Sequence, residues 1–361
     1  MKINHLIKYT MKLNYKFWGA ILCIAARCGI YSCQKNTVTP DGGNADESEF
    51  YTLNLGWAGD ILSVTEEPLI KSDETSDLYG IQVYSTPNKE LENGENPSWT
   101  KYAYGVFDMA DNISIKLIKG NKYKFEATMV VDGKNVIHDE NAGRYEEPFY
   151  TWGENRGRST VTNSFTYQSS TYLQVGGSKV YTWNEDHTAL VSYAHAQVER
   201  FYGELLDYTP GINNSKEYIK MKRVCFGAKF IVKGSLANEG TMEISMNNSK
   251  EILIDLSSEE KMYSSIYTFQ NVVEAYKNNE YSEAIETTIN WNKPDGTVIP
   301  LGTHKIEFKR NKMSVVNIEL DNNQGLGNIG VIVDDTDMED DEEETTIKDG
   351  EIADTNIDNK E

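Results

Sequence analysis

Three glycines near the end of the chain have the spacing of a dinucleotide-binding loop. Gly325, Gly327 and Gly330 lie in QGLGNIGVIV, residues 324–333, and match G-x-G-x-x-G. Such a loop binds a pyrophosphate when a helix begins at its last glycine, because the helix N-terminus supplies the unpaired N–H groups. Here a strand-like run, GVIVDD, follows instead, and an acidic segment comes after it. The motif therefore predicts turns, and we expect no cofactor.

Two histidines and a carboxylate are the residues best suited to a metal ion. His187, His195 and Glu199 lie close together in sequence, and imidazole and carboxylate are ordinary zinc ligands. They stand on no defined element, however, because residues 189–201, ALVSYAHAQVERF, fit a helix and a strand equally well. Nucleophile-elbow, H-E-x-x-H, C-x-x-C and phosphate-loop motifs are missing from the sequence. We predict no metal ligand and no catalytic residue, although 56 acidic residues leave a glycosidase-type carboxylate pair open.

A run of aromatic residues is the best candidate for a binding site. Phe149, Tyr150 and Trp152 stand beside Arg156 and Arg158 in EEPFYTWGENRGRST, residues 146–160. Exposed aromatic rings next to hydrogen-bonding groups can stack on sugar rings, which would make this segment a glycan site. The alternative, which we favour, is that the rings cover the edge of a sheet.

The chemistry of the N-terminal segment centres on Cys33. Residues 30–33 read Ile-Tyr-Ser-Cys and resemble a bacterial lipobox, in which the thiol accepts a diacylglycerol and the small Ser32 lets a signal peptidase reach the bond before Cys33. Lysines precede the apolar stretch FWGAILCIAA, and the first acidic residue is Asp41. This is the layout of an export signal, whether translation begins at Met1 or at Met11. We predict cleavage between Ser32 and Cys33, lipidation (palmitate) of Cys33, and anchoring in the cell outer membrane at the surface.

The remaining cysteine is predicted to be chemically inert. After removal of residues 1–32 only Cys33 and Cys225 remain, which leaves no pair for an intrachain disulfide. Cys225 lies in MKRVCFGAKFIV, an apolar strand pattern, and we expect its thiol to be buried. The neighbouring Arg223 is expected to form a structural ion pair rather than to contact a ligand.

The charge of the chain excludes one class of partner. A formal net charge of −21 in 361 residues argues against binding to nucleic acid, whose phosphates require clustered Lys and Arg. From Asp334 to Glu361 there are fourteen acidic residues and two lysines. That segment has too few apolar residues to offset the entropy of ordering, so we predict a disordered acidic tail over 336–361.

The elements between the two ends are predicted to be strands. Alternating or apolar runs recur at short intervals, among them 78–86, 112–120, 123–137 and 217–234, with Asp132-Gly133 and Asp295-Gly296 as hairpin turns. One short amphipathic helix is expected at 269–277. The fold class is all-β, with two β-sandwich domains and few short helices. The predicted parts are a signal peptide (1–32), a flexible tether (33–49), an N-terminal domain (50–212), a C-terminal domain (213–335) and the tail (336–361).

With these parts laid out, the chain resembles the fimbrillin-like lipoproteins of Bacteroidota, the family of type V pilus subunits and their anchor and tip relatives. YIKMKRVCFGAKFIVKG, residues 218–234, is similar to the strand that opens that family's C-terminal domain. IEFKRNKMSVVNIEL, residues 306–320, and the later IGVIVDD are similar to its closing strands, with a turn at Arg310-Asn311.

The resemblance implies two transthyretin-like sandwiches and a non-enzymatic role in cell adhesion or in pilus assembly and anchoring. It also implies partners that are pilus-type subunits joined by strand exchange: a protease cleaves after Arg or Lys, removes the first strand, and a neighbour's strand fills the groove. No arginine occurs between Cys33 and Arg144, so Lys71 is the candidate maturation site. An anchor or accessory subunit is therefore favoured over a polymerising one. The alternative function is a surface glycan-binding lipoprotein.

Overall fold

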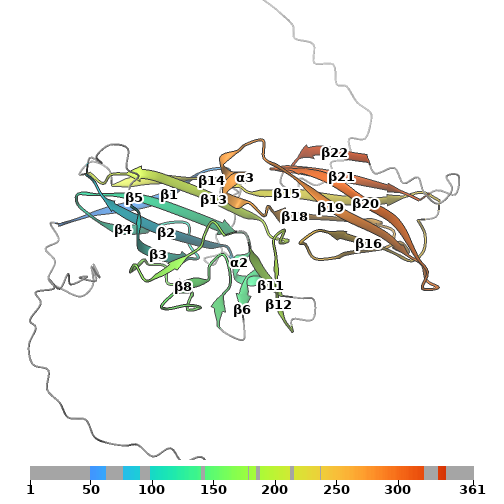
Figure 1. Cartoon of the computed structure of the whole chain (residues 1–361), viewed down its shortest axis with the longest axis horizontal. Coiled ribbons are helices and arrows are strands. Elements are labelled where there is room, and N and C mark those ends of the chain that lie inside the picture. Colours follow the sequence, from blue (N-terminus) through green and yellow to red (C-terminus); the bar gives the residue numbers. More distant parts are fainter. Residues whose placement is uncertain are drawn as a thin grey trace, which may run out of the picture. The chain divides into compact units, whose positions relative to one another are not determined.

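An eight-stranded sheet contains most of the first half of the chain. The computed structural model describes residues 49–61, 76–89, 98–139, 143–177, 179–183, 188–211, 215–235, 237–320 and 332–338, all within one compact unit, 37–361. The strand order is β4-β1-β14-β13-β5-β2-β3-β9. All of these strands except β9 are labelled in Figure 1. These strands are β1 (Phe50–Gly59), β2 (Leu78–Pro87), β3 (Thr100–Phe107), β4 (Ile113–Ile118), β5 (Asn121–Val130), β9 (Thr166–Tyr167), β13 (Arg200–Tyr208) and β14 (Lys216–Arg223).

The sheet is rolled so that its two ends share one core. The hydroxyl of Tyr102, on β3, donates to the carbonyl of Lys116, on β4, at 2.8 Å, and the amide of Lys116 donates to the hydroxyl of Tyr167 at 2.9 Å. Alternate residues of the strands face inward, as a period of two requires. Leu53, Ile115 and Phe125 are among the side chains that form this core.

Short strands and one helix cover the outer face of the same sheet. They are α2 (Gly133–Val136), β6 (His138–Asp139), β7 (Arg144–Tyr145), β8 (Thr151–Gly153), β10 (Thr171–Leu173), β11 (Val180–Trp183) and β12 (Leu190–Tyr193). They pair as the ribbons β6-β7, β8-β10 and β11-β12. Phe149, Leu173 and Val175 of this layer pack with Leu78 and Val130 of the sheet.

Two four-stranded sheets form the second half. One has the order β18-β15-β21-β22 and the other β17-β16-β19-β20. The strands are β15 (Cys225–Lys233), β16 (Thr241–Met246), β17 (Ile252–Asp255), β18 (Met262–Thr268), β19 (Ser282–Asn292), β20 (Val298–Lys309), β21 (Lys312–Glu319) and β22 (Ile332–Asp337), with α3 (Val272–Lys277) before β19. Phe226 is at the centre of their core, where its ring lies 4.6 Å from that of Phe308 and 5.6 Å from that of Tyr267.

These elements confirm the all-β prediction. The short helix predicted at 269–277 is present as α3, which begins at Val272; Phe269 is buried but lies before the helix. The ambiguous segment 189–201 contains the strand β12 and the start of β13, so it is not a helix. Asp295-Gly296 is the hairpin turn between β19 and β20, as predicted. Asp132-Gly133 is not a hairpin turn: it leads into α2, where the amides of Val136 and Ile137 donate to the carbonyls of Asp132 and Gly133. Gly133 lies against Leu78, where a Cβ atom would collide with that side chain.

The change from one sheet system to the other lies at Val224, between β14 and β15. The predicted domain boundary at 212–213 would place residues 216–223 in the C-terminal domain, whereas β14 pairs with β1 and β13. The sequence reads as one apolar strand through Arg223 and Cys225, so it gives no sign of the change. At the other end, β22 runs to Asp337, two residues beyond the predicted end of the C-terminal domain at 335.

Candidate functional site

Several predicted residues lie outside the described part of the chain. They are the signal segment with Ser32 and Cys33, the candidate cleavage residue Lys71, His187, and the glycines of 325–330. Lipidation of Cys33 and cleavage after Lys71 therefore stay predictions. In the residues that the structure describes, no helix is long and apolar enough to cross a membrane.

The aromatic segment has one buried member and two half-buried ones. Phe149 has no exposed surface and packs in the core, so it cannot stack on a ligand in this structure. The rings of Tyr150 and Trp152 make an edge contact with centroids 5.2 Å apart. The guanidinium of Arg156 lies 4.4 Å from the centroid of the Trp152 ring, and its Nε donates to the Tyr150 hydroxyl at 3.1 Å. Any sugar that stacked on Trp152 would have to displace this arginine.

A carboxyl group beside Trp152 is perturbed by burial. Burial raises the pKa of Glu147, and the lowering effects of Lys179, the Trp152 indole and Arg200 offset this only in part. A carboxyl that keeps its proton to a higher pH can act as a hydrogen-bond donor. The charge of the neighbouring Glu146 also raises the pKa of Glu147, but Glu146 is itself paired with Arg144 at 3.1 Å, so we assign the two carboxyl groups no catalytic role.

His195 and Glu199 have separate structural partners. The ring of His195 is buried, with Nδ1 2.8 Å from the carbonyl oxygen of Asn247 and Nε2 3.1 Å from the carboxylate of Glu283. Glu199 instead forms an ion pair with Arg223. Among the described residues, no cluster of three or more His, Cys, Asp or Glu could hold a metal ion.

The strand β1 has two different neighbours along its length. Its first half, Phe50–Leu55, pairs antiparallel with β4, and its second half, Asn54–Gly59, pairs parallel with β14. Leu53, Leu55 and Trp57 are buried on one face. The Trp57 indole stacks on Tyr79 and donates to the carbonyl of Ala110 at 3.0 Å. Burying three such side chains stabilises the fold by roughly 5–9 kcal/mol as an upper estimate.

The end of β1 meets the turn between β20 and β21. Asp60 Oδ2 accepts from the backbone amide of Arg223 at 3.1 Å and lies 3.3 Å from Nη1 of Arg310. The same Nη1 of Arg310 donates to the carbonyl of Arg223 at 2.9 Å. We call Asp60, Glu199, Arg223, Arg310 and Asn311 the junction cluster, because they connect the rolled sheet to the second half of the chain.

Arg223 is the central member of the junction cluster. Its Nε lies 2.7 Å from Glu199 Oε1, and its Nη1 donates to Asn311 Oδ1 at 3.0 Å. Its side chain is 8% exposed. The sequence predicted a structural ion pair for Arg223 and missed its partners, because they lie 24 and 88 positions away.

The one cysteine of the described residues is inert, as predicted. Cys225 has no exposed surface, and burial raises the pKa of its thiol to about 12. Its Sγ accepts from the backbone amide of Arg200 at 3.0 Å. A thiol that is protonated and inaccessible takes no part in exchange chemistry.

The last described strand lies in its own sheet. β22 pairs antiparallel with β21, from Asn317 opposite Ile332 to Lys312 opposite Asp337. In sequence, the alternate residues of β22 are Ile332, Asp334 and Thr336 in one row and Val333, Asp335 and Asp337 in the other. Neither row offers the three apolar residues that β1 buries.

Comparison with known proteins gives structural similarity only. No protein-family model matches the chain, and no curated protein matches its sequence. Similar solved structures include a candidate cell adhesion protein from Bacteroides uniformis (10% identity, 80% of this chain and 98% of that one, TM-score 0.33). The tip fimbrial protein Mfa3 from Porphyromonas gingivalis is 12% identical over 80% of this chain and 99% of that one, with a TM-score of 0.30. A fimbrial protein from Bacteroides vulgatus is 11% identical over 79% and 99%, with a TM-score of 0.32.

These neighbours are of the kind that the sequence resemblance named, Bacteroidales adhesins and fimbrial proteins. At identities of 10–12% and TM-scores near 0.3, no residue role transfers from them to this chain.

Proposed function

We propose that this protein is a non-enzymatic, lipid-anchored surface protein that acts in cell adhesion or in the assembly and anchoring of a fimbria. The observation that carries the proposal is the position of β1. This strand completes the sheet between β4 and β14, and its buried row of Leu53, Leu55 and Trp57 fills the core from a segment at the start of the fold.

Such a strand can be replaced by a strand of another chain. Cleavage after Lys71 would separate β1 from the rest of the fold and leave main-chain hydrogen-bonding groups of β4 and β14 unpaired. An incoming extended segment would satisfy them, with affinity from the main chain and specificity from the pockets for alternate side chains. The core pockets emptied by Leu53, Leu55 and Trp57 would then accept only a donor strand in which every second residue has an apolar side chain.

The chain's own last described strand, β22, does not have this pattern of apolar residues. An aspartate would fall at a core position whichever row of β22 faced inward, and an unpaired buried carboxylate is strongly unfavourable. We therefore propose that the protein receives a strand but does not pass its own on to an identical copy. That property suits an anchor or accessory subunit better than a polymerising one.

Anchoring at Cys33 belongs to the protein before cleavage, because a cut after Lys71 removes Cys33 together with β1; a copy that stays uncleaved keeps the anchor. The 16 residues 34–49 between Cys33 and β1 span at most about 55 Å when fully extended. Two acyl chains bind the protein stably to the membrane, whereas a single acyl chain binds only marginally and reversibly. The outer-membrane location and the lipid are part of the proposal.

The test is to remove β1 and ask which peptides replace it. A site-specific protease sequence inserted within residues 62–75 allows β1 to be cut off, and mild denaturant then separates it. A synthetic peptide of residues 49–61 should rebind and restore the thermal melt of the cut protein. The same peptide carrying Leu55→Asp, and a peptide of residues 330–338, should not.

Two results would contradict the proposal. The first is a cut protein that keeps its full melting temperature without β1, which would mean that β1 is not required for the stability of the fold. The second is restoration by the 330–338 peptide, which would make the chain a self-polymerising subunit. For the native cleavage, the N-terminus of the mature protein should follow residue 71 in the wild type and not in Lys71→Ala.

Glycan binding by Tyr150 and Trp152 is a second candidate. In this candidate function a sugar would displace the exposed Arg156 from the half-buried Trp152 ring and take its place. Soluble glycans should then shift tryptophan fluorescence in the wild type, and Trp152→Leu should abolish the shift. Equal shifts in both proteins would eliminate this segment as the site.

A further inference from the structure

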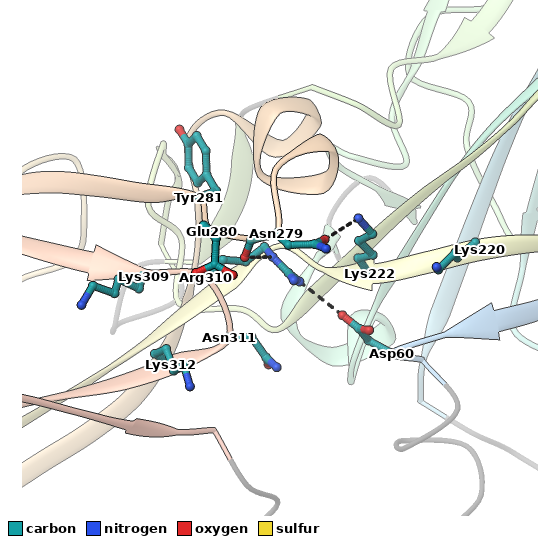
Figure 2. A pocket seen from close by; sticks show the side chains of 10 residues that line it. All are labelled: Asp60, Lys220, Lys222, Asn279, Glu280, Tyr281, Lys309, Arg310, Asn311 and Lys312. Atoms are coloured by element: carbon teal, nitrogen blue, oxygen red, sulfur yellow. Dashed lines mark hydrogen bonds and ion pairs between the residues drawn. The ribbon is translucent and has the colours of Figure 1, made fainter.

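A polar cavity lies beside the junction cluster. Its volume is about 330 Å³, and it opens where β14, the segment after α3 and the β20–β21 turn come together (Figure 2). The residues that line it are Asp60, Lys220, Lys222, Asn279, Glu280, Tyr281, Lys309, Arg310, Asn311 and Lys312.

The cavity is basic although the protein is strongly acidic. Five of the lining residues are cations and two are acids, a net charge of +3, in a chain of net charge −21. Figure 2 shows Lys309 and Lys312 on one side of Arg310, and Lys220 and Lys222 on the other. Lys220 and Lys222 share one face of β14, since Met221 between them is buried.

The cations repel one another in the present arrangement. The pKa of Lys222 is lowered by partial burial and by the charges of Arg310 and Lys220, against the raising effect of Asp60. Lys222 Nζ donates to Asn279 Oδ1 at 2.6 Å, a neutral acceptor. An anion entering the cavity would therefore meet a lining whose net charge is positive.

The acidic end of the chain emerges next to this cavity. Asp337, the last residue of β22, pairs with Lys312, and the amide of Met338 donates to the carbonyl of Asn311 at 3.5 Å. Both Asn311 and Lys312 line the cavity. The residues that follow Met338, Glu339–Glu344, are six consecutive acids.

We propose that this basic cavity is an anion-binding site and that its occupant is the acidic segment Glu339–Glu344 of the same chain. The segment has the opposite charge and begins one residue beyond a backbone contact with the cavity wall. Six residues span about 20 Å when extended, so its carboxylates reach the cavity without distortion of β22.

The tether favours the chain's own segment over a free anion. Because the segment begins directly after Met338, its effective concentration at the cavity is on the order of millimolar. Because the contacts are between charges near the surface, salt screens them: the Debye length falls from about 10 Å at 0.1 M to about 3 Å at 1 M. The tail then acts as a built-in competitor that any acidic partner of this surface must displace.

The first experiment maps the contact in the full chain. A zero-length carbodiimide reagent joins carboxylates to lysines, and mass spectrometry of the digest locates the links. Links between 339–344 and Lys309, Lys312, Lys220 or Lys222 are expected at low salt and should vanish at 1 M NaCl. A mixture of ¹⁴N- and ¹⁵N-labelled protein should give links of one isotope only; links of mixed isotope would make a second copy the occupant and overturn the proposal.

The second experiment measures competition. A labelled peptide of residues 338–346 should bind a chain truncated after Met338, and bind the full chain at least tenfold more weakly because the tail occupies the site. Lys309→Glu with Lys312→Glu should abolish binding to the truncated chain. Lys305→Glu with Lys116→Glu changes the net charge equally at exposed positions away from the cavity and should leave binding within twofold.

Two outcomes of the competition would overturn the proposal. Equal affinity of the truncated and full chains would show that the tail does not occupy the cavity. Equal loss in the cavity and control variants would show that the peptide responds only to net charge. The melting temperatures of all variants, measured alongside, separate loss of binding from loss of folding.

Discussion

The ion pair between Arg223 and Glu199 permits a quantitative test of how the two halves of the fold are joined. The Arg223 Nε–Glu199 Oε1 distance is 2.7 Å, although the direction of the N–H bond does not meet hydrogen-bond geometry. The side chains are 8% and 19% exposed. Exposed pairs contribute about 0.2–1 kcal/mol, whereas removing one member of a buried pair costs about 3–5 kcal/mol.

This pair lies between those limits, because Glu199 keeps some contact with water. We expect Arg223→Met to lower the free energy of unfolding by about 2–3 kcal/mol, including the lost hydrogen bond to Asn311. Glu199→Gln keeps an acceptor in place and should cost about 1 kcal/mol. In a double-mutant cycle the coupling energy should be about 1–2 kcal/mol.

The measurement is urea unfolding of the four proteins, followed by circular dichroism. A matched control is the Lys124–Glu126 pair, which has the same 2.7 Å separation but side chains that are 25% and 18% exposed. Lys124→Met with Glu126→Gln should show a coupling below about 1 kcal/mol. A coupling between Arg223 and Glu199 no larger than that of the control would refute the structural role given to the junction cluster.

Three further predictions concern the aromatic segment, the anchor and the tail. The pKa of Glu147 is raised above its ordinary value of 4.5, so the unfolded state ionises first as pH rises and stability falls until the folded carboxyl also ionises. Glu147→Gln should thus raise the melting temperature at pH 7 and not at pH 4; a constant difference across pH would contradict this cause. Uncleaved Lys71→Ala protein should incorporate labelled palmitate and sediment with membranes, and adding Cys33→Ser should abolish both while adding Cys23→Ser or Cys28→Ser changes neither; a soluble, unlabelled Lys71→Ala protein would rule out the anchor. Truncation after Met338 should leave a cooperative melt with a midpoint within a few degrees, and loss of that melt would show that the tail is part of the folded core.

The fold class followed from the sequence because its signals are local. Period-two alternation, the turn at Asp295-Gly296 and the helical face of Val272 and Tyr276 each depend on neighbours in the chain. Which strands pair with each other is not determined by neighbours in the chain. Residues 217–234 read as one strand, and only tertiary packing assigns 216–223 to one sheet and 225–233 to another.

The sites were harder to predict for the same reason. Phe149 and Trp152 look equivalent in sequence, but burial separates them, since Phe149 fits against Gly80 in the core. The basic cavity was missed altogether, because its cations come from segments about ninety residues apart. A signal was present: KMKR (220–223) and KRNK (309–312) are the dense basic clusters of an otherwise acidic mature chain.

The parallel pairing of β1 with β14 also has a mechanical consequence. A tether at Cys33 would pull on the N-terminal end of β1, while a load on the second half of the chain would pull on the C-terminal end of β14, which leads through Val224 into β15. In a parallel pair those two forces act along the strands in opposite directions, so the hydrogen bonds from Asn54 to Gly59 are sheared together rather than opened one at a time. A surface protein loaded in this direction would resist extension most strongly at the strand that its maturation would remove.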